Sequence, residues 1–173
     1  MKTALIRTAA VLVGLAAWLP GVLPAIAQED GTPYSTIVKA PEFRLASAID
    51  GRTQSLSGLK GKVRIVDFWA TWCPPCRAEI PDFVSLQKQY KSKGLEVIGL
   101  SVDRGGPAVV KEFAKQYGIN YACLMADDAT KQAYGGIRGI PTTFVIGRKG
   151  NIYKKYVGGR DRATFEADIQ ALL

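Results

Sequence analysis

The sequence predicts one α/β domain whose central mixed β-sheet is flanked by helices on both faces. Strand-like and helix-like segments alternate from residue 63 to residue 134, and a pair of strand-like segments then precedes a C-terminal helix-like segment. The 173 residues and the hydrophobic content of 47% are also sufficient for one ordinary core.

The first elements lie before the centre of the predicted sheet. Residues 43–45 alternate in polarity, which predicts a short strand before a turn at Asp50-Gly51. Residues 56–62 are typical of a brief turn. Residues 63–69 are mostly apolar on both alternations, as expected for a strand that is buried on both faces.

A long helix is predicted from Cys73 to about Lys93, with Gly94 as its terminator. Pro74 and Pro75 are compatible with its first turn, where the missing N–H groups would have no partner within the helix. The remaining strands are predicted at 95–102, 121–125, 142–146 and 152–157, and the remaining helices at 107–117, 129–134 and 162–173. Residues 148–151 predict a hairpin-type turn between the last two strands.

The N-terminus has the layout of a secretory signal peptide over residues 1–27. Lys2 and Arg7 precede the apolar stretch Thr8 to Leu19, and Ala25-Ile26-Ala27 fits a cleavage site. The alternative is an uncleaved membrane anchor that tethers the protein. We therefore expect an export signal at 1–27, a flexible lead-in at 28–40, a folded domain at 41–173, and a periplasmic or other extracytoplasmic location.

Charge and composition exclude several kinds of site. The net charge of +8 becomes +6 without residues 1–27, because Lys2 and Arg7 are lost with no acid. The cations are scattered, which favours solubility over attraction to acidic partners or membrane surfaces. Nothing in the sequence resembles a nucleic-acid-binding motif. The chain has no histidine, so Ser-His-Asp and Cys-His catalysis and His-containing zinc sites are excluded. Thiols remain as candidate nucleophiles.

Cys73 and Cys76 are two residues apart at the start of the predicted helix. They can close a reversible disulfide, and the helix N-terminus favours a thiolate. We expect Cys73 to be partly exposed as the nucleophile and Cys76 to be more buried as the resolving thiol. The alternatives are a structural disulfide and half of a metal site, but the further ligands that zinc needs are missing. The prediction is a redox-active disulfide with no other cofactor and no metal.

Two segments resemble the thioredoxin superfamily, and more closely its extracytoplasmic TlpA/ResA/CcmG-like branch. Val66 to Pro81 resembles the active-site segment, and Gly139 to Phe144 resembles the cis-proline loop. Ser101 to Asp127 resembles the insertion of that branch, and the likeness covers residues 41–173. The resemblance implies a thioredoxin fold with a TlpA/peroxiredoxin-like inserted βα unit.

The resemblance also implies a substrate-binding surface beside the cysteine pair. Ile140 and Pro141 would face the cysteines and offer backbone groups to an extended client, since a cis X–Pro bond exposes the preceding backbone. Trp72 would flank Cys73 as an apolar contact surface. The proline pair Pro74 and Pro75 would complete this surface.

Two acids are candidates for moving the thiol proton. Asp67 lies in an otherwise apolar strand, where burial raises the pKa of a carboxyl group. Classical thioredoxins have an aspartate there, whereas many members of the extracytoplasmic branch have asparagine. Glu79 matches the acid of that branch, and its alternative is a solvated helix carboxylate near the dipole. Cys123 is predicted to be a buried, free thiol.

These observations predict an exported thiol–disulfide oxidoreductase. The resemblance implies that it reduces disulfides of client proteins, including apocytochrome c cysteine pairs, and that a membrane electron donor of the DsbD/CcdA type re-reduces it. One alternative is a peroxiredoxin-like thiol peroxidase, although the Pro-x-x-x-Thr-x-x-Cys setting is missing. Another is a copper-binding module with two thiolate ligands, although the distal histidine is missing.

Overall fold

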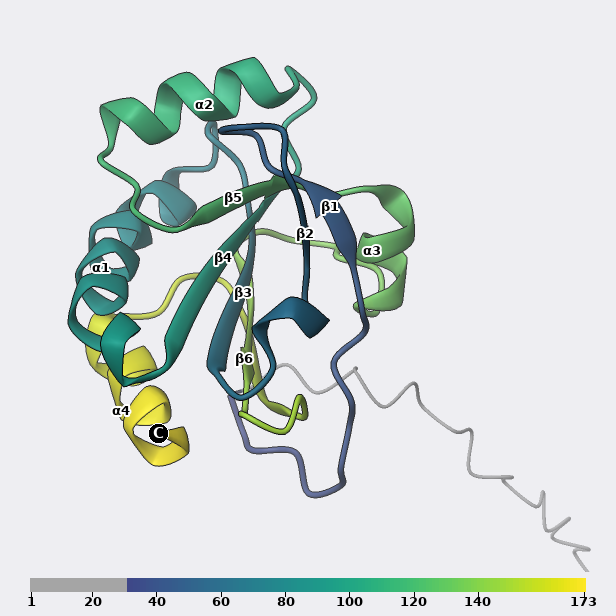
Figure 1. Ribbon diagram of the computed structural model, residues 1–173, viewed down its shortest axis with the longest axis vertical. Helices are drawn as coiled ribbons and strands as arrows, with labels where there is room; N and C mark the ends of the chain where they lie inside the picture. Colours follow the sequence, from purple (N-terminus) through teal and green to yellow (C-terminus); the bar gives the residue numbers. More distant parts are fainter. Residues whose placement is uncertain (1–30) are drawn as a thin grey trace, which may run out of the picture.

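The computed structural model describes residues 31–173, which fold around a five-stranded mixed β-sheet (Figure 1). Its strands are β3 (Val63–Trp69), β4 (Leu95–Ser101), β5 (Ala122–Met125), β6 (Thr142–Ile146) and β7 (Ile152–Val157). Their order in the sheet is β5-β4-β3-β6-β7. The central strand β3 is parallel to β4 and antiparallel to β6. Every residue of β3 is buried, as its apolar sequence predicts.

Helices cover both faces of this sheet. They are α1 (Pro74–Tyr90), α2 (Pro107–Gln116), α3 (Asp128–Ala133) and α4 (Arg162–Leu172). On one side α1 and α4 lie next to each other, and Phe83 packs on Phe165 with ring centroids 5.0 Å apart (Figure 1). On the other side, where α3 lies, Phe68 packs on Tyr134 with ring centroids 5.4 Å apart. The predicted α/β fold with helices on both faces is confirmed.

The inserted unit consists of α2 and β5, which lie between β4 and α3 along the chain. β5 runs parallel to β4 and forms one edge of the sheet. Phe113 of α2 packs against Trp69, the last residue of β3, with ring centroids 5.5 Å apart. The insertion therefore contacts the strand that leads into the cysteine pair.

Two local predictions need correction. The predicted strand at 43–45 is one half of a small hairpin, β1 (Arg44–Ala46) with β2 (Thr53–Ser55), and the 3₁₀ helix η1 (Ser57–Leu59) follows it. The long helix ends at Tyr90, and the last predicted residues form the 3₁₀ turn η2 (Lys91–Lys93). Gly94 terminates this turn at φ +104°, a conformation that favours glycine.

Residues 31–40 lie along the edge strand β7. The Gly31 N–H donates to Lys155 O at 3.1 Å, and the Tyr34 N–H donates to Tyr153 O at 3.1 Å. Val38 is buried in the core. This part of the predicted lead-in therefore packs on the domain, and the folded part begins before residue 41. The predicted signal peptide lies outside the described residues, and from residue 31 onward no helix is long and apolar enough to cross a membrane.

Candidate active site

The cysteine pair lies where β3 ends and α1 begins. Cys73 is the N-cap of α1, with Pro74 and Pro75 in the first helical turn. Its sulfur accepts a hydrogen bond from the Cys76 N–H at 3.3 Å, and the two cysteines form a disulfide. Free N–H groups and the positive end of the helix dipole lie at this position. The helix start therefore stabilises a Cys73 thiolate when the pair is reduced.

Both cysteines are buried in this oxidised state. The exposed fraction is 3% for Cys73 and 2% for Cys76, so the prediction that Cys73 is partly exposed is wrong here. The reason is the environment of the disulfide, which joins the same apolar cluster as Ile80 and Phe83. Exchange therefore requires an incoming thiolate to reach a sulfur of which very little is exposed.

The loop before β6 covers one side of the disulfide. The Ile140–Pro141 peptide bond is cis, as the resemblance implies, and Ile140 O lies 3.7 Å from Cys73 Sγ. In the disulfide this sulfur carries no hydrogen, whereas the reduced thiol can donate to that carbonyl. Trp72 is 64% exposed beside the pair. Trp72 and Ile140 also line one hollow of about 370 Å³.

The turn between β3 and Cys73 is held by Asp103, which the sequence analysis did not single out. The buried carboxylate accepts the Thr71 N–H at 3.0 Å and the Thr71 hydroxyl at 2.6 Å. It also accepts the Ser101 hydroxyl at 2.8 Å. These bonds tie the residues before Cys73 to the end of β4, which fixes where α1 begins.

Asp67 lies in the middle of β3 and is buried. Burial raises its pKa well above the usual range, and the neighbouring charge of Glu79 raises it further. The Thr143 hydroxyl donates to Asp67 Oδ1 at 3.0 Å and opposes this rise in pKa. Burial therefore makes the Asp67 carboxylate a stronger base than that of an exposed aspartate.

Glu79 lies one turn after Cys76 and is 3% exposed, so the alternative of a solvated helix carboxylate is wrong. Burial raises its pKa to about 7, although the backbone N–H of Arg160 donates to Oε1 at 2.6 Å and lowers the pKa in part. The other oxygen, Oε2, is buried and has no hydrogen-bond partner among the described residues. Near neutral pH this carboxyl group can both accept and release a proton.

These acids belong to a larger buried group of titratable side chains. Tyr121 has a pKa well above its usual range, mainly because of burial, with further effects of Cys123, Asp67 and Glu79. Cys123 is free and fully buried, as predicted, and burial raises its pKa to about 12. Its thiol is therefore un-ionised at neutral pH and unsuited to attack. Tyr121 and the Arg160 N–H were not anticipated, because both come from segments far from Cys73 in sequence.

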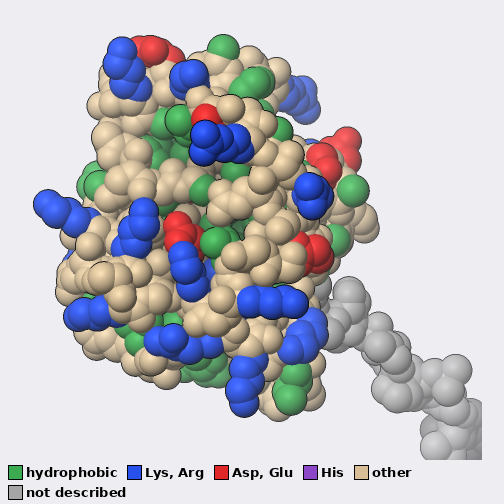
Figure 2. All heavy atoms as spheres, viewed as in Figure 1, with side chains coloured by type: hydrophobic (Ala, Val, Ile, Leu, Met, Phe, Trp, Pro, Cys, Tyr) green, Lys and Arg blue, Asp and Glu red, His purple; other side chains and the backbone are tan. Residues whose placement is uncertain are grey.

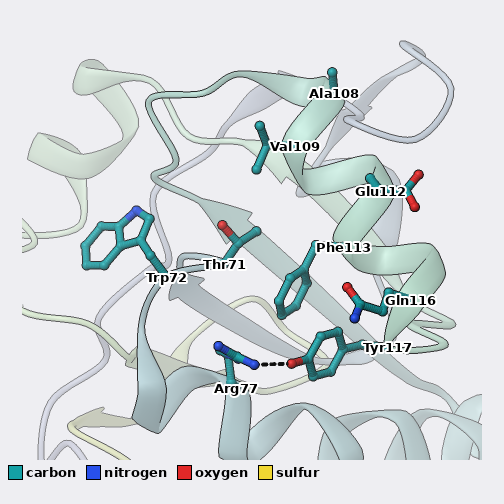
Figure 3. Close-up of a pocket in the computed structure, with 9 residues that line it drawn as sticks. All are labelled: Thr71, Trp72, Arg77, Ala108, Val109, Glu112, Phe113, Gln116 and Tyr117. Atoms are coloured by element: carbon teal, nitrogen blue, oxygen red, sulfur yellow. Dashed lines mark hydrogen bonds between the residues drawn. The ribbon is translucent and has the colours of Figure 1, made fainter.

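A groove of about 690 Å³ lies between the start of α1 and helix α2 (Figure 3). The Arg77 guanidinium donates a hydrogen bond to the Tyr117 hydroxyl and lies 5.5 Å from the centre of that ring. Phe113 stacks on Tyr117 with ring centroids 4.1 Å apart. The inserted helix is thus fixed to α1 at Arg77, the residue directly after Cys76.

The raised pKa of Glu79 predicts that the oxidised protein becomes less stable as pH rises. Between about pH 4.5 and 7 the unfolded chain has released this proton while the folded chain still holds it, so the free energy of unfolding falls. The difference between about 7 and the ordinary 4.5 corresponds to roughly 3 kcal/mol. Asp67 acts in the same direction. Urea denaturation at pH 4.5, 6 and 8 measures the decline.

Glu79→Gln is the matched variant, because its amide oxygen can still accept the Arg160 N–H but the group cannot ionise. The decline from pH 4.5 to 8 should be smaller in this variant by roughly 3 kcal/mol. Equal declines in both proteins would contradict a raised pKa for Glu79.

With the fold and the cysteine pair established, the class of the protein follows: it is a thioredoxin-like thiol–disulfide oxidoreductase with Cys73 and Cys76 as its redox pair. The chain belongs to the Redoxin family, whose model matches residues 38–173.

Named relatives agree with this family. The thiol-disulfide oxidoreductase ResA of Bacillus thuringiensis (strain Al Hakam) is 33% identical over 136 residues, which are 78% of this chain and 76% of the relative. ResA of Bacillus subtilis (strain 168) is 35% identical over 119 residues, 69% of this chain and 65% of the relative. Among solved structures, a thioredoxin-family thiol:disulfide interchange protein from Chlorobium tepidum TLS is 40% identical with a TM-score of 0.74, covering 80% of this chain and 97% of that one.

Proposed function

We propose that this protein works as an extracytoplasmic reductase of client disulfides. The observation that carries the proposal is the position of the cysteine pair at the N-terminus of α1, next to two buried acids with raised pKa values. The helix N-terminus favours the Cys73 thiolate that attacks a client. An ionised carboxylate near the pair acts in the opposite direction: it disfavours the thiolate form, so it favours the disulfide and adds to the reducing power of the reduced pair.

The reaction has two exchange steps. The Cys73 thiolate attacks one sulfur of a client disulfide, forming a mixed disulfide and releasing the other client sulfur as a thiolate. Cys76 then loses its proton and attacks Cys73 Sγ, which closes the Cys73–Cys76 disulfide and releases the second client thiolate. The client gains the two electrons that the protein loses. The protein releases one proton, from Cys76, and the two client thiolates take their protons from solvent.

Glu79 and Asp67 serve as acceptors for the Cys76 proton in the second step. Glu79 has a pKa of about 7 and a buried oxygen that has no hydrogen-bond partner within residues 31–173, so it suits proton transfer near neutral pH. Asp67 lies within electrostatic range of Glu79, and its bond to Thr143 fixes its orientation. The client backbone is received by a surface around the pair, formed by Trp72, Pro74, Pro75, Ile140 and Pro141.

The cellular context is proposed from the sequence and the relatives. The apolar stretch and cleavage site within residues 1–27 support export, with a membrane tether as the alternative. The likeness to ResA supports clients that include the cysteine pairs of apocytochromes c. A membrane electron donor of the DsbD/CcdA type re-reduces the pair by the reverse exchange.

Trapping with Cys76→Ala tests the proposal. This variant lacks the resolving thiol, so mixed disulfides through Cys73 should accumulate and migrate as reducible adducts in non-reducing gels. The double variant Cys73→Ala with Cys76→Ala is the control and should trap nothing. If Cys73→Ala alone traps clients and Cys76→Ala does not, the two cysteines have the opposite roles.

A further inference from the structure

A basic pocket lies at the end of the sheet opposite the disulfide. It has a volume of about 390 Å³ and lies between the lead-in, η1 and the turn that joins β6 to β7. Its charged lining residues are Lys39, Glu42, Lys60, Arg64, Arg148 and Lys149. Figure 2 shows Lys and Arg side chains gathered over the lower end of the molecule, where Figure 1 places this turn. The lining residues thus include five basic side chains and one acid, although the Arg148 guanidinium donates to the carbonyl oxygens of Gly61, Lys93 and Leu173.

Arg64 is the buried charge of this pocket. It is the second residue of β3 and is 2% exposed, which is rare for arginine. Burial lowers its pKa, and the charge of Glu42 opposes this in part. Its Nη2 donates to Gly147 O at 2.5 Å, which ties β3 to the turn after β6. Nothing in residues 31–173 accepts a hydrogen bond from its Nε, which is buried. A buried donor without an acceptor is costly, so the site is suited to an acceptor from outside the chain.

The rim adds lysines that form no ion pair with an acid of residues 31–173. Lys60 and Lys149 are exposed, and Lys39 Nζ donates to the carbonyl of Lys149 rather than to an acid. Glu42, the acid of the lining, accepts the Ser57 N–H at 3.0 Å and so fixes η1. Like charges around one hollow repel one another, and a bound anion reduces this repulsion.

We propose that this pocket binds a phosphate-type oxyanion, with the Arg64 guanidinium as its buried anchor and Lys39, Lys60 and Lys149 at its rim. A guanidinium presents several N–H donors in a fork that matches phosphate oxygens, and ammonium groups add attraction without a fixed geometry. The oxyanion can be free phosphate or the headgroup of an anionic phospholipid. In the second case the protein rests on a membrane.

The position of the pocket suits a role separate from catalysis. From Arg64 to Trp69 the strand β3 spans about 17 Å, and the cysteine pair lies beyond Trp69. A membrane or anion bound at the basic end therefore leaves the disulfide free to meet clients. This inference does not depend on the proposed reductase function.

Two titrations with the purified full chain test the proposal and separate the two sources. In the first, inorganic phosphate is added in a phosphate-free, low-salt buffer and binding is followed by calorimetry. In the second, vesicles of phosphatidylglycerol are compared with vesicles of phosphatidylcholine in a sedimentation assay. The phosphatidylcholine arm measures any binding through the apolar N-terminal stretch, which does not need an anionic headgroup.

Two variants probe the pocket. The double variant Lys60→Glu with Lys149→Glu reverses the charge of two rim residues. Arg64→Lys keeps the positive charge but removes the forked N–H donors of the guanidinium. The matched control is Lys111→Glu with Lys115→Glu on α2, because it changes the net charge equally at exposed positions away from the pocket. Both probes should weaken binding at least tenfold, and the control should weaken it less than twofold. All folded variants should keep the wild-type rate of disulfide reduction.

Each outcome decides the matter. Binding of one phosphate per chain, with an affinity that both probes weaken, supports a free anion as the ligand. Binding to phosphatidylglycerol vesicles alone, with an affinity that both probes weaken, supports a lipid headgroup. Absence of binding in both titrations overturns the proposal, and so does equal weakening by the rim probe and the control. If Arg64→Lys folds and binds as the wild type does, the pocket is not the site. If Arg64→Lys fails to fold, the test is the stoichiometry of the wild-type protein, and more than one phosphate per chain overturns the proposal.

Discussion

Replacing Cys73 with serine should reduce the rate of client-disulfide reduction by at least about 10³-fold. The serine hydroxyl does not ionise near neutral pH, so the helix N-terminus has no thiolate to stabilise. The variant should remain folded, because serine is a favourable N-cap residue and can accept the Cys76 N–H as the sulfur does. Turbidity of insulin in the presence of dithiothreitol measures the rate, and circular dichroism measures the fold.

Cys123→Ala is the control for the loss of a thiol. Cys123 is fully buried and its pKa is raised to about 12, so its removal should change the rate by less than about twofold. The assignment of the redox pair would be contradicted if Cys73→Ser kept a tenth of the activity, or if Cys123→Ala lost most of it.

The second large effect is expected from the two buried acids. Removing both, as Asp67→Asn with Glu79→Gln, should slow resolution of the mixed disulfide at pH 7 on the order of 10²-fold, because no group next to Cys76 then accepts its proton. The single variant Glu79→Gln should remove the pH dependence near pH 7 that its carboxyl group imposes. Stopped-flow kinetics of a single turnover from pH 5 to 9 measures both effects.

Asp128→Asn is the matched control for these variants, because this carboxylate is 98% exposed on α3 and pairs with Lys131. Its pH profile should follow that of the wild type. A double acid variant that resolves mixed disulfides at the wild-type rate across the whole range would show that water, rather than Asp67 or Glu79, takes the proton.

The elements that the sequence predicted well are those whose signal is local. β6 and β7 match their predicted bounds, because two apolar strands flank a polar turn. The cysteine pair was identifiable because its spacing and the preceding strand lie within one short segment. Asp67 was found for the same reason, since it is the one acid among the seven residues of β3.

What the sequence did not predict depends on contacts between distant segments. The N–H that binds Glu79 comes from Arg160, 81 residues later, and a backbone N–H has no signature in a sequence. The predicted exposure of Cys73 was wrong because the disulfide joins the apolar cluster of the core and because Ile140, 67 residues later, lies against its sulfur. Likewise, residues 31–40 lack a regular pattern, yet their backbone groups pair with β7.

The reduction potential of the Cys73–Cys76 pair tests the central claim most directly. It is measured by equilibrating the purified protein with mixtures of reduced and oxidised dithiothreitol or glutathione and counting free thiols. If the buried acids disfavour the thiolate form, the potential should lie on the reducing side, below about −200 mV and towards that of thioredoxin. A value near −120 mV, which is typical of a strong oxidant, would contradict the proposal that this protein reduces its clients.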